Sequence, residues 1–319
     1  MNVLGIDHGN ESIKTPYTVF TAGLGAYQHV PPLTSEWILY KGTYYTLSKT
    51  PQVYAKDKTK NINYFIYTLF ALCREEKNNT ITFKEPVDLS IGLPPLHMAS
   101  LKNDFKNYFR DNFGEECVCV YCGVEKVIHV NRIAVWAQGY AAAYAYHTWT
   151  KANGKIEIKS EILNKYKRYL VCDIGGVTVD YIYFDDNLPV LDKCDTRETG
   201  MNNMAEDMIA KIQLEFGYTL NRKDISEVTR NEPNILPENI KEYIFKCRDE
   251  WATKIITDAQ SKIGDLRTIP CLFMGGGSGQ LKASLLKSEL YPPYAEIISD
   301  QKANALGYDM LLKHQLGKY

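Results

Sequence analysis

Two eight-residue segments of the chain repeat one pattern of residue types that could bind phosphate. The first, Asp7–Lys14, reads Asp-His-Gly-Asn-Glu-Ser-Ile-Lys, and the second, Asp173–Asp180, reads Asp-Ile-Gly-Gly-Val-Thr-Val-Asp. Each begins with Asp after an apolar run, has Gly third and Ser or Thr sixth, and ends on a charged residue. The segments lie about half a chain apart, which predicts two similar halves that each present a tight hairpin turn.

The chemistry of this pattern is that of an anion site. Glycine lets a turn point several backbone N–H groups in one direction, which makes a concave site for phosphate. A hydroxyl in each segment and Lys14 in the first could add contacts, and the leading Asp of each could hold Mg²⁺ through its waters. Two such loops facing across a cleft would hold a nucleoside triphosphate. The alternative is an ordinary hairpin capped by an Asx turn, which a single copy would favour.

A third glycine-rich segment supports the nucleotide interpretation. The apolar run Cys271–Met274 predicts a strand, and it leads directly into Gly275-Gly276-Gly277-Ser278. Two copies of the repeat together with this run favour a nucleotide site over two unrelated hairpins.

Strands and helices alternate along each half, which predicts the α/β class. Apolar runs predict strands at 3–6, 37–40, 43–47, 87–91, 117–122, 125–130, 169–172, 178–184 and 271–274. Helical spacing predicts an amphipathic helix at 61–77, a long buried helix at 134–148, and further helices at 101–109, 204–216, 240–255 and 301–313. We expect one domain at 1–150, completed by a C-terminal helix at 301–319, and a second at 151–300. The hydrophilic segment 151–167 marks the boundary, and the second domain has a small lobe near 218–262, exposed at 221–237.

Three closely spaced cysteines, Cys117, Cys119 and Cys122, could suggest a metal site. A structural zinc site usually takes four ligands, commonly as two pairs, and the chain has no second pair. Because Cys117 and Cys119 alternate with valines, we interpret them as small apolar residues of a buried strand.

Composition restricts the classes of function. The 319 residues fit about two domains. The 37 basic and 38 acidic residues give a net charge of −1, which argues against direct nucleic-acid binding. No apolar run approaches the roughly 20 residues of a membrane span, and the first residues lack the pattern of a secretory signal. We therefore expect a cytoplasmic protein with reduced cysteines and no membrane partner.

The two repeats and the triple glycine resemble the nucleotide-binding segments of the actin, sugar-kinase and heat-shock-chaperone ATPase superfamily. Asp7–Lys14 resembles its first phosphate loop, Asp173–Asp180 its second, and Phe273–Ser278 its adenosine loop. Ile133–Tyr144 and Asp300–Leu311 resemble its two connecting helices. The resemblance implies an actin-like fold, in which two similar ribonuclease-H-like domains face each other across a nucleotide cleft.

Within this superfamily, the chain is most similar to the ParM/StbA bacterial actin-like proteins, which segregate plasmids. The similarity rests on the compact length and on Gly5-Ile6-Asp7-His8-Gly9-Asn10. It implies ATP, or GTP, with Mg²⁺ as cofactors, self-association into filaments, and an adaptor protein bound to plasmid DNA as a partner.

The resemblance also implies roles for individual residues. Asp7 and Asp173 would lie near Mg²⁺ and its water shell. The β- and γ-phosphates would be contacted by Gly9, Asn10, Ser12 and Lys14 on one side and by Gly175, Gly176 and Thr178 on the other. The adenosine would lie against Gly275, Gly276, Gly277 and Ser278, and Gly200 matches a turn beside the nucleotide.

Gln138 matches the position that orients the attacking water. ParM relatives commonly carry Glu there, whereas actin carries Gln. Because Gln cannot act as a general base, we assign it water positioning. The alternative is a polar residue that is hydrogen-bonded where the chain crosses between domains.

The function that these observations favour is an ATPase that forms filaments. Nucleotide binding between two halves would set their angle, and that angle would control head-to-tail contacts, which build open filaments. A small-molecule kinase of the same superfamily is an alternative, but it needs a positioned acid or base for which we find no motif. A membrane-associated scaffold is another, but residues 311–319 are too short for a convincing amphipathic anchor.

Overall fold

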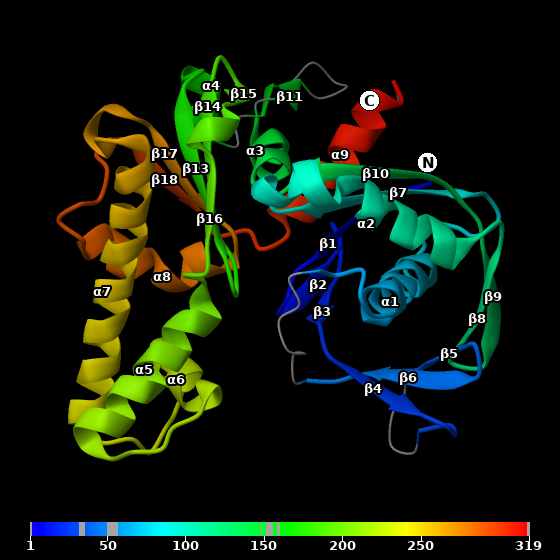
Figure 1. Ribbon diagram of the computed structural model, residues 1–319, viewed down its shortest axis with the longest axis horizontal. Helices are drawn as coiled ribbons and strands as arrows, with labels where there is room; N and C mark the ends of the chain where they lie inside the picture. Colours follow the sequence, from blue (N-terminus) through cyan, green and yellow to red (C-terminus); the bar gives the residue numbers. More distant parts are fainter. Residues whose placement is uncertain are drawn as a thin grey trace. The chain divides into compact units, whose positions relative to one another are not determined.

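The computed structural model describes residues 2–31, 36–49, 57–147, 149–150, 156–157 and 160–317. The chain separates into two compact units, each with its own strands, helices and core (Figure 1). Unit 1 contains residues 1–145 and 302–319, and unit 2 contains residues 146–301. Both units mix helices with parallel and antiparallel strands, so the α/β class is confirmed. Part of the predicted boundary segment 151–167 lies outside the described residues.

The first sheet of unit 1 carries the first of the two repeats. Its strands lie in the order β10 (Val130–Ala137), β7 (Val87–Leu93), β1 (Val3–His8), β2 (Ser12–Lys14) and β3 (Val19–Thr21). The first three are parallel, and β2 and β3 extend the sheet antiparallel. Every residue of β1 and β7 is buried, which is typical of strands covered on both faces.

The second sheet of unit 1 is antiparallel. Its strands lie in the order β4 (Leu24–Tyr27), β6 (Thr43–Leu47), β5 (Ile38–Tyr40), β8 (Cys117–Tyr121) and β9 (Val124–Ile128). Strands β5 and β6 confirm the predicted strands at 37–40 and 43–47 and form a hairpin, whose turn residues Lys41 and Gly42 both have positive φ. Cys117 and Cys119 are buried on β8, as predicted, while Cys122 is exposed in the following turn. No cluster of three or more His, Cys, Asp or Glu that could hold a metal occurs among the described residues.

The described helices of unit 1 are α1 (Asn63–Lys77), α2 (Met98–Phe113), α3 (Tyr140–Tyr146) and α9 (Ala303–Gln315). A 3₁₀ turn at Pro95–His97 precedes α2, and the last residue of α3 belongs to unit 2. The prediction that α1 is amphipathic is wrong. Every residue from Tyr64 to Cys73 is buried, because α1 lies between the two sheets of the unit (Figure 1). The spacing of apolar residues predicted a helix with one buried face, but the helix is buried on all its faces.

The helix predicted at 134–148 is wrong in its first half. Residues through Ala137 belong to β10, which pairs in parallel with β7, and α3 begins only at Tyr140. Alanine favours helices, but pairing and burial beside β7 outweigh that preference. Ile133–Tyr144 is therefore not one connecting helix, and Gln138 lies in the turn that follows a strand.

Helix α9 fixes the position of this turn relative to β1. A Cβ atom at Gly307 would lie 1.8 Å from the carbonyl oxygen of Ala141, and one at Gly5 would lie 2.1 Å from that of Ala305. Glycine at these two positions therefore lets α9 contact both α3 and β1 through backbone atoms. The side chain of Asn304 also accepts a hydrogen bond of 2.8 Å from the backbone N–H of Gly139.

The sheet of unit 2 carries the second repeat. Its main path is β15 (Leu188–Pro189), β14 (Val179–Asp185), β13 (Tyr169–Ile174), β17 (Cys271–Met274) and β18 (Ala295–Ile298). Strand β16 (Asp195–Arg197) pairs with β14 beside β15. Strands β13, β17 and β18 are parallel, and the hairpin partner β14 is antiparallel to β13.

The described helices of unit 2 are α4 (Glu161–Lys165), α5 (Met201–Phe216), α6 (Arg222–Thr229), α7 (Glu238–Ile263) and α8 (Gly276–Lys287). Shorter elements are the strand pair β11 (Trp149–Thr150) and β12 (Ile156–Glu157) and 3₁₀ turns at Leu191–Lys193 and Leu266–Thr268. Gly217 ends α5 with positive φ. The expectation that 221–237 is exposed is wrong in part, because α6 buries Ile225 and Val228 in the same core as α5 and α7. No described helix is long and apolar enough to cross a membrane.

Candidate functional site

The two repeats form hairpins with the same register. In unit 1, Asp7 lies opposite Lys14 and His8 opposite Ile13. In unit 2, Asp173 lies opposite Asp180 and Ile174 opposite Val179. Each hairpin therefore has four turn residues, 9–12 and 175–178, directly after the strand that carries its Asp. The repeat seen in the sequence is a repeat of backbone structure.

In the first hairpin, predicted site residues gather around the carboxylate of Asp7. The Lys14 ammonium donates a hydrogen bond of 3.1 Å to Oδ2 of Asp7, and Nε2 of Gln138 donates one of 2.9 Å to Oδ1. Gln138 can reach Asp7 because it follows β10, and β10 and β1 lie in the same sheet, separated only by β7. The structure thus joins Gln138 to two residues of the first hairpin that are far from it in the sequence.

A second lysine, Lys58, was missed by the sequence analysis. Its ammonium is buried and donates a hydrogen bond to the backbone carbonyl of His8, the residue after Asp7. Lys58 lies in the polar segment 57–61, which has the composition of a solvated loop, so its sequence carries no signal of burial. A long cationic side chain that is almost fully buried beside a carboxylate is rare in proteins, and this burial marks Lys58 as part of the site.

These cations keep Asp7 ionised. Burial alone would raise the pKa of Asp7, but the nearby charges of Lys14 and Lys58 and the hydrogen bonds from Lys14 and Gln138 outweigh it. The pKa of Asp7 therefore lies below its ordinary value. An ionised carboxylate with cationic neighbours can accept hydrogen bonds from the water shell of a metal ion.

The turn of the first hairpin requires glycine at its start. A Cβ atom at Gly9 would lie 2.6 Å from the carbonyl oxygen of Ser12 and 2.9 Å from Nζ of Lys14. The next residue, Asn10, accepts a hydrogen bond of 3.1 Å from the hydroxyl of Tyr64 on α1. Gly9, Asn10, Ser12 and Lys14 are thus held together by α1 and by the hairpin itself.

In the second hairpin, the turn is attached to the beginning of α5. The backbone N–H groups of Gly200, Met201 and Asn202 donate hydrogen bonds of 2.9, 3.1 and 2.6 Å to the carbonyls of Val177, Gly175 and Gly176. In a trans peptide the N–H points away from the preceding C=O, and the described residues contain no cis peptide. The N–H groups of Gly176, Val177 and Thr178 are therefore directed away from α5, which is the arrangement of an anion-binding turn.

The glycines outside this turn permit close packing against it. A Cβ at Gly200 would lie 2.4 Å from the backbone carbon of Val177. Gly275 has positive φ, and a Cβ there would lie 2.4 Å from Oδ1 of Asp173. A Cβ at Gly277 would lie 2.4 Å from Cγ2 of Ile174. Within unit 2, the structure therefore brings Gly200, Gly275 and Gly277 together with the second hairpin.

Two predicted adenosine residues differ in their freedom to contact a ligand. Ser278 is fully buried, and its hydroxyl donates to the carbonyls of Gly275 and Ile298 at 2.8 and 3.1 Å. Ser278 thus fixes the start of α8. An alanine at Gly276 would make only ordinary contact with Gln301, at 3.5 Å, so packing within the unit does not require glycine there.

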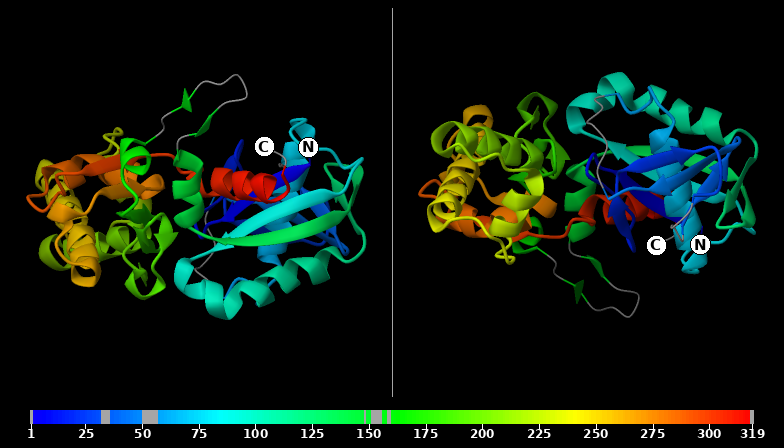
Figure 2. Two further views of the ribbon diagram at one scale, coloured as in Figure 1. Left: turned by 90° about the horizontal axis from the view of Figure 1, so that it is seen from above. Right: turned by 90° about the horizontal axis from the view of Figure 1, so that it is seen from below.

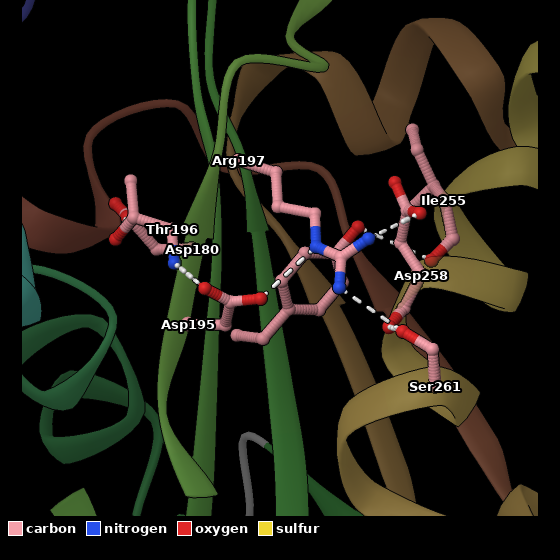
Figure 3. Close-up of polar contacts among 8 residues, drawn as sticks. Asp180, Asp195, Thr196, Arg197, Ile255, Asp258 and Ser261 are labelled. Atoms are coloured by element: carbon pink, nitrogen blue, oxygen red, sulfur yellow. Dashed lines mark hydrogen bonds and ion pairs between the residues drawn. The ribbon is translucent and has the colours of Figure 1, made fainter. Parts of the chain in front are cut away.

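The residue opposite Asp173 belongs to a polar network that the sequence did not reveal. Asp180 accepts a hydrogen bond of 2.6 Å from the hydroxyl of Thr196 on β16. The next residue, Arg197, donates to Asp195 on the same strand and to Asp258 and Ser261 on α7 (Figure 3). This network attaches β16 to α7 and so supports the hairpin strand β14 from outside.

Comparison with known proteins gives the class of fold. The native crystal structure of Ta0583, an archaeal actin homologue, is 17% identical, with a TM-score of 0.75 over 98% of this chain and 100% of that chain. A ParM filament structure from Clostridium botulinum is 19% identical, with a TM-score of 0.73 over 98% and 100%. The structure of Bacillus thuringiensis ParM with ATP is 12% identical, with a TM-score of 0.67 over 99% of each chain. The chain therefore has the actin-like fold, as the sequence predicted.

A family model described as archaeal actin homologue MreB-like, C-terminal, matches residues 171–287. This range begins in β13 and ends with α8, so it contains the second hairpin and the triple glycine. No curated protein matches the chain. The family model, over residues 171–287, and the structures together support the actin-like fold that the sequence resembles.

Proposed function

We propose that this protein binds and hydrolyses ATP with Mg²⁺ and assembles into filaments in a nucleotide-dependent manner. The observation that carries the proposal is the pair of hairpins with one register, each with an Asp directly before a turn suited to phosphate. Structures of similar proteins contain ADP, in Ta0583, or ATP, in Bacillus thuringiensis ParM, which supports nucleotide binding by this chain.

The two hairpins would contact the phosphates in different ways. The first would supply charge from Lys14 together with polar contacts from Gly9, Asn10 and Ser12. The second would supply the N–H groups directed away from α5, within the turn that contains Gly175, Gly176 and Thr178. Gly200 would keep α5 close to that turn. Gly275 and Gly276 would leave the adenosine room to approach, while Gly277 and Ser278 would hold the start of α8.

The donor set fits a magnesium ion that keeps most of its waters. Asp7 is ionised, and its neighbours Lys14 and Gln138 hold its two oxygens in place. Asp173 occupies the same position in the second hairpin. Bound Mg²⁺ would neutralise phosphate charge. Asp7 and Asp173 would orient its water shell from the two hairpins.

Gln138 is the residue that we propose positions the attacking water. Its Nε2 is used in the bond to Asp7, which leaves its Oε1 as the atom that accepts a hydrogen bond from water. An amide oxygen cannot remove the proton in the way a carboxylate can, so Gln138 orients the water without acting as a base.

The filament follows from the nucleotide site by a conformational argument. Contacts with the γ-phosphate exist only before hydrolysis, and only a difference of this kind can shift a conformational equilibrium. Filament structures are known for ParM from Clostridium botulinum and for Alp12, which supports self-association of this chain. We further propose a role in plasmid segregation through an adaptor protein bound to plasmid DNA, on the resemblance to ParM/StbA proteins.

The nucleotide site is tested by titration calorimetry with ATP and with GTP, each with and without Mg²⁺. Lys14→Ala should weaken ATP binding by about tenfold, since it removes one charged phosphate contact. Lys84→Ala is the matched control, because Lys84 is an exposed lysine of the same unit outside the hairpin. Equal affinity of Lys14→Ala and the parent protein would remove Lys14 from the site.

Assembly is tested by light scattering and electron microscopy after addition of nucleotide. Scattering should rise with ATP and Mg²⁺ and fall as phosphate is released. Nucleotide binding without filaments, over a range of salt and protein concentrations, would instead favour the small-molecule kinase.

A further inference from the structure

Unit 1 has a groove of ≈ 540 Å³ along the outer edge of its first sheet. The floor of the groove is β10, which has a pairing partner on one side only within the described part of the chain. Helix α2 borders β10 on one side, and the end of α9 borders β10 on the other (Figure 2). None of the residues proposed to bind nucleotide lines this groove.

The charge of the groove has one sign. Lys102, Lys106 and Arg110 follow one another at intervals of four residues on α2, and Arg132 joins them from β10. No Asp or Glu is among the described residues that line the groove, and none of the four cations forms an ion pair with a carboxylate in the described ranges. Four cations gathered without a counter-charge favour an acidic ligand.

The backbone of β10 can extend the sheet. The N–H of Gln138 donates to the carbonyl of Leu93 on β7, and successive residues of a strand direct their backbone groups to alternate sides. The backbone groups of Ile133 and Val135 are therefore directed to the outer edge. An open strand edge is a template for one more strand.

Apolar side chains line the groove beside these charges. Leu312 and Leu316 come from the end of α9, and Trp136 comes from β10. The indole N–H of Trp136 donates to the hydroxyl of Ser90 at 2.9 Å, so its polar atom is already satisfied. The groove thus offers cations, apolar surface and backbone groups to one ligand.

We propose that this groove binds an acidic, extended segment of a partner protein, which pairs with β10 as an added strand. Acidic side chains on one face of the segment would contact Lys102, Lys106 and Arg110, and apolar ones on the other would contact Trp136 and Leu316. A nucleic acid could satisfy the cations but not the strand edge, and the net charge of −1 does not favour it.

The probe is an acetylated octapeptide of alternating Glu and Val, titrated into the full chain and followed by calorimetry. Two further octapeptides separate charge from strand pairing. One replaces Glu with Lys, and the other keeps the charge but carries N-methyl groups on alternate peptide nitrogens. The first octapeptide should bind, and the other two should bind at least about tenfold more weakly.

The protein variants test the location. K102E/K106E should weaken binding of the octapeptide by about tenfold or more. The control K84E/K282E makes the same change in net charge at exposed lysines outside the groove and should leave binding unchanged. Circular dichroism confirms that both variants are folded.

Three outcomes would overturn the proposal: no binding of the Glu-Val octapeptide, equal binding of its N-methylated form, or equal weakening by the two double variants. A single-stranded oligonucleotide that binds where the octapeptide does not would assign the groove to nucleic acid instead.

Discussion

The two hairpins share a backbone but differ in the residue that faces the Asp. In unit 1 that residue is Lys14, which forms an ion pair with Asp7. In unit 2 it is Asp180, which places two carboxylates opposite each other and accepts a hydrogen bond from Thr196. The neighbourhood differs in the same sense, since Lys58 is buried beside the first hairpin and glycines surround the second.

Under the proposed function, this difference would divide the work of holding a triphosphate between the two hairpins. The first hairpin would supply positive charge through side chains, and the second would supply backbone N–H groups through the turn that hydrogen-bonds to the start of α5. The same hairpin backbone thus occurs twice with different side chains. Substitutions in the two hairpins should therefore have different effects on stability, binding and turnover.

The largest expected effect is the loss of either Asp. Asp173→Ala and Asp7→Ala should each lower the rate of phosphate release by about 10³-fold, since each removes a carboxylate that we propose orients the water shell of Mg²⁺. Only Asp7→Ala should also lower the free energy of unfolding substantially, by about 3 kcal/mol, because it removes a buried carboxylate whose charge offsets those of Lys14 and Lys58.

Phosphate release and urea unfolding on the same samples measure both effects. Asp185→Ala, at the exposed end of β14, is the control for removing an acidic residue from the same hairpin strand. A folded Asp173→Ala protein with normal turnover would show that the second hairpin does not contribute an acid to the site.

The next effect concerns Gln138, which donates a hydrogen bond to Asp7 of the first hairpin. Gln138→Ala should slow hydrolysis by about 10²-fold while ATP still binds, because one group that positions water is lost. Filaments should then form with ATP and persist longer than those of the parent protein. Normal turnover with ordinary filament lifetimes, followed by electron microscopy and phosphate release, would remove Gln138 from the mechanism.

The hairpins were predictable from the sequence because their chemistry is local. Gly9, Gly175 and the two Asp residues occupy fixed places in short motifs, and the motif alone implied the turn. Lys58 could not be predicted, because its burial depends on how α1 and β1 pack around a polar segment. The same holds for β10, where pairing with β7 outweighs the helical preference of its alanines.

A smaller effect arises from His8, whose counterpart in the second hairpin is the apolar Ile174. Thr68 donates its hydroxyl to the carbonyl of Tyr64, so His8 donates its Nε2–H to Thr68 and is neutral. Burial, together with the charge of Lys58, lowers the pKa of His8 from 6.5 to about 3. Below pH 6.5 the unfolded chain therefore binds a proton that the folded chain does not.

The stability of the protein should consequently fall as the pH drops from 6.5 toward 3, with His8 contributing up to about 1.4 kcal/mol per pH unit. His8→Leu should remove this contribution, and Ile174→Leu should not change it. Urea unfolding without nucleotide or Mg²⁺ at several pH values measures the slope. A slope that is the same in His8→Leu and the parent would contradict the assignment.

The smallest expected difference compares the first glycine of each turn. At Gly9 a Cβ atom would lie 2.6 Å from a backbone carbonyl oxygen, whereas at Gly175 the nearest atom, the carbonyl oxygen of Thr178, would be 3.0 Å away. Real Cβ atoms tolerate the second distance after a small shift but not the first. Gly9→Ala must also displace the ammonium of Lys14, which lies 2.9 Å from the added atom. We therefore expect Gly9→Ala to cost about 1 kcal/mol more unfolding free energy than Gly175→Ala.

Gly9→Ala should also weaken ATP binding more than Gly175→Ala, since it moves the Lys14 charge that the first hairpin would supply. Urea unfolding and calorimetry on the two variants test both statements. If Gly175→Ala had the larger effect on ATP binding, the backbone of the second hairpin would matter more than the charge of the first, and the division of work between them would be reversed.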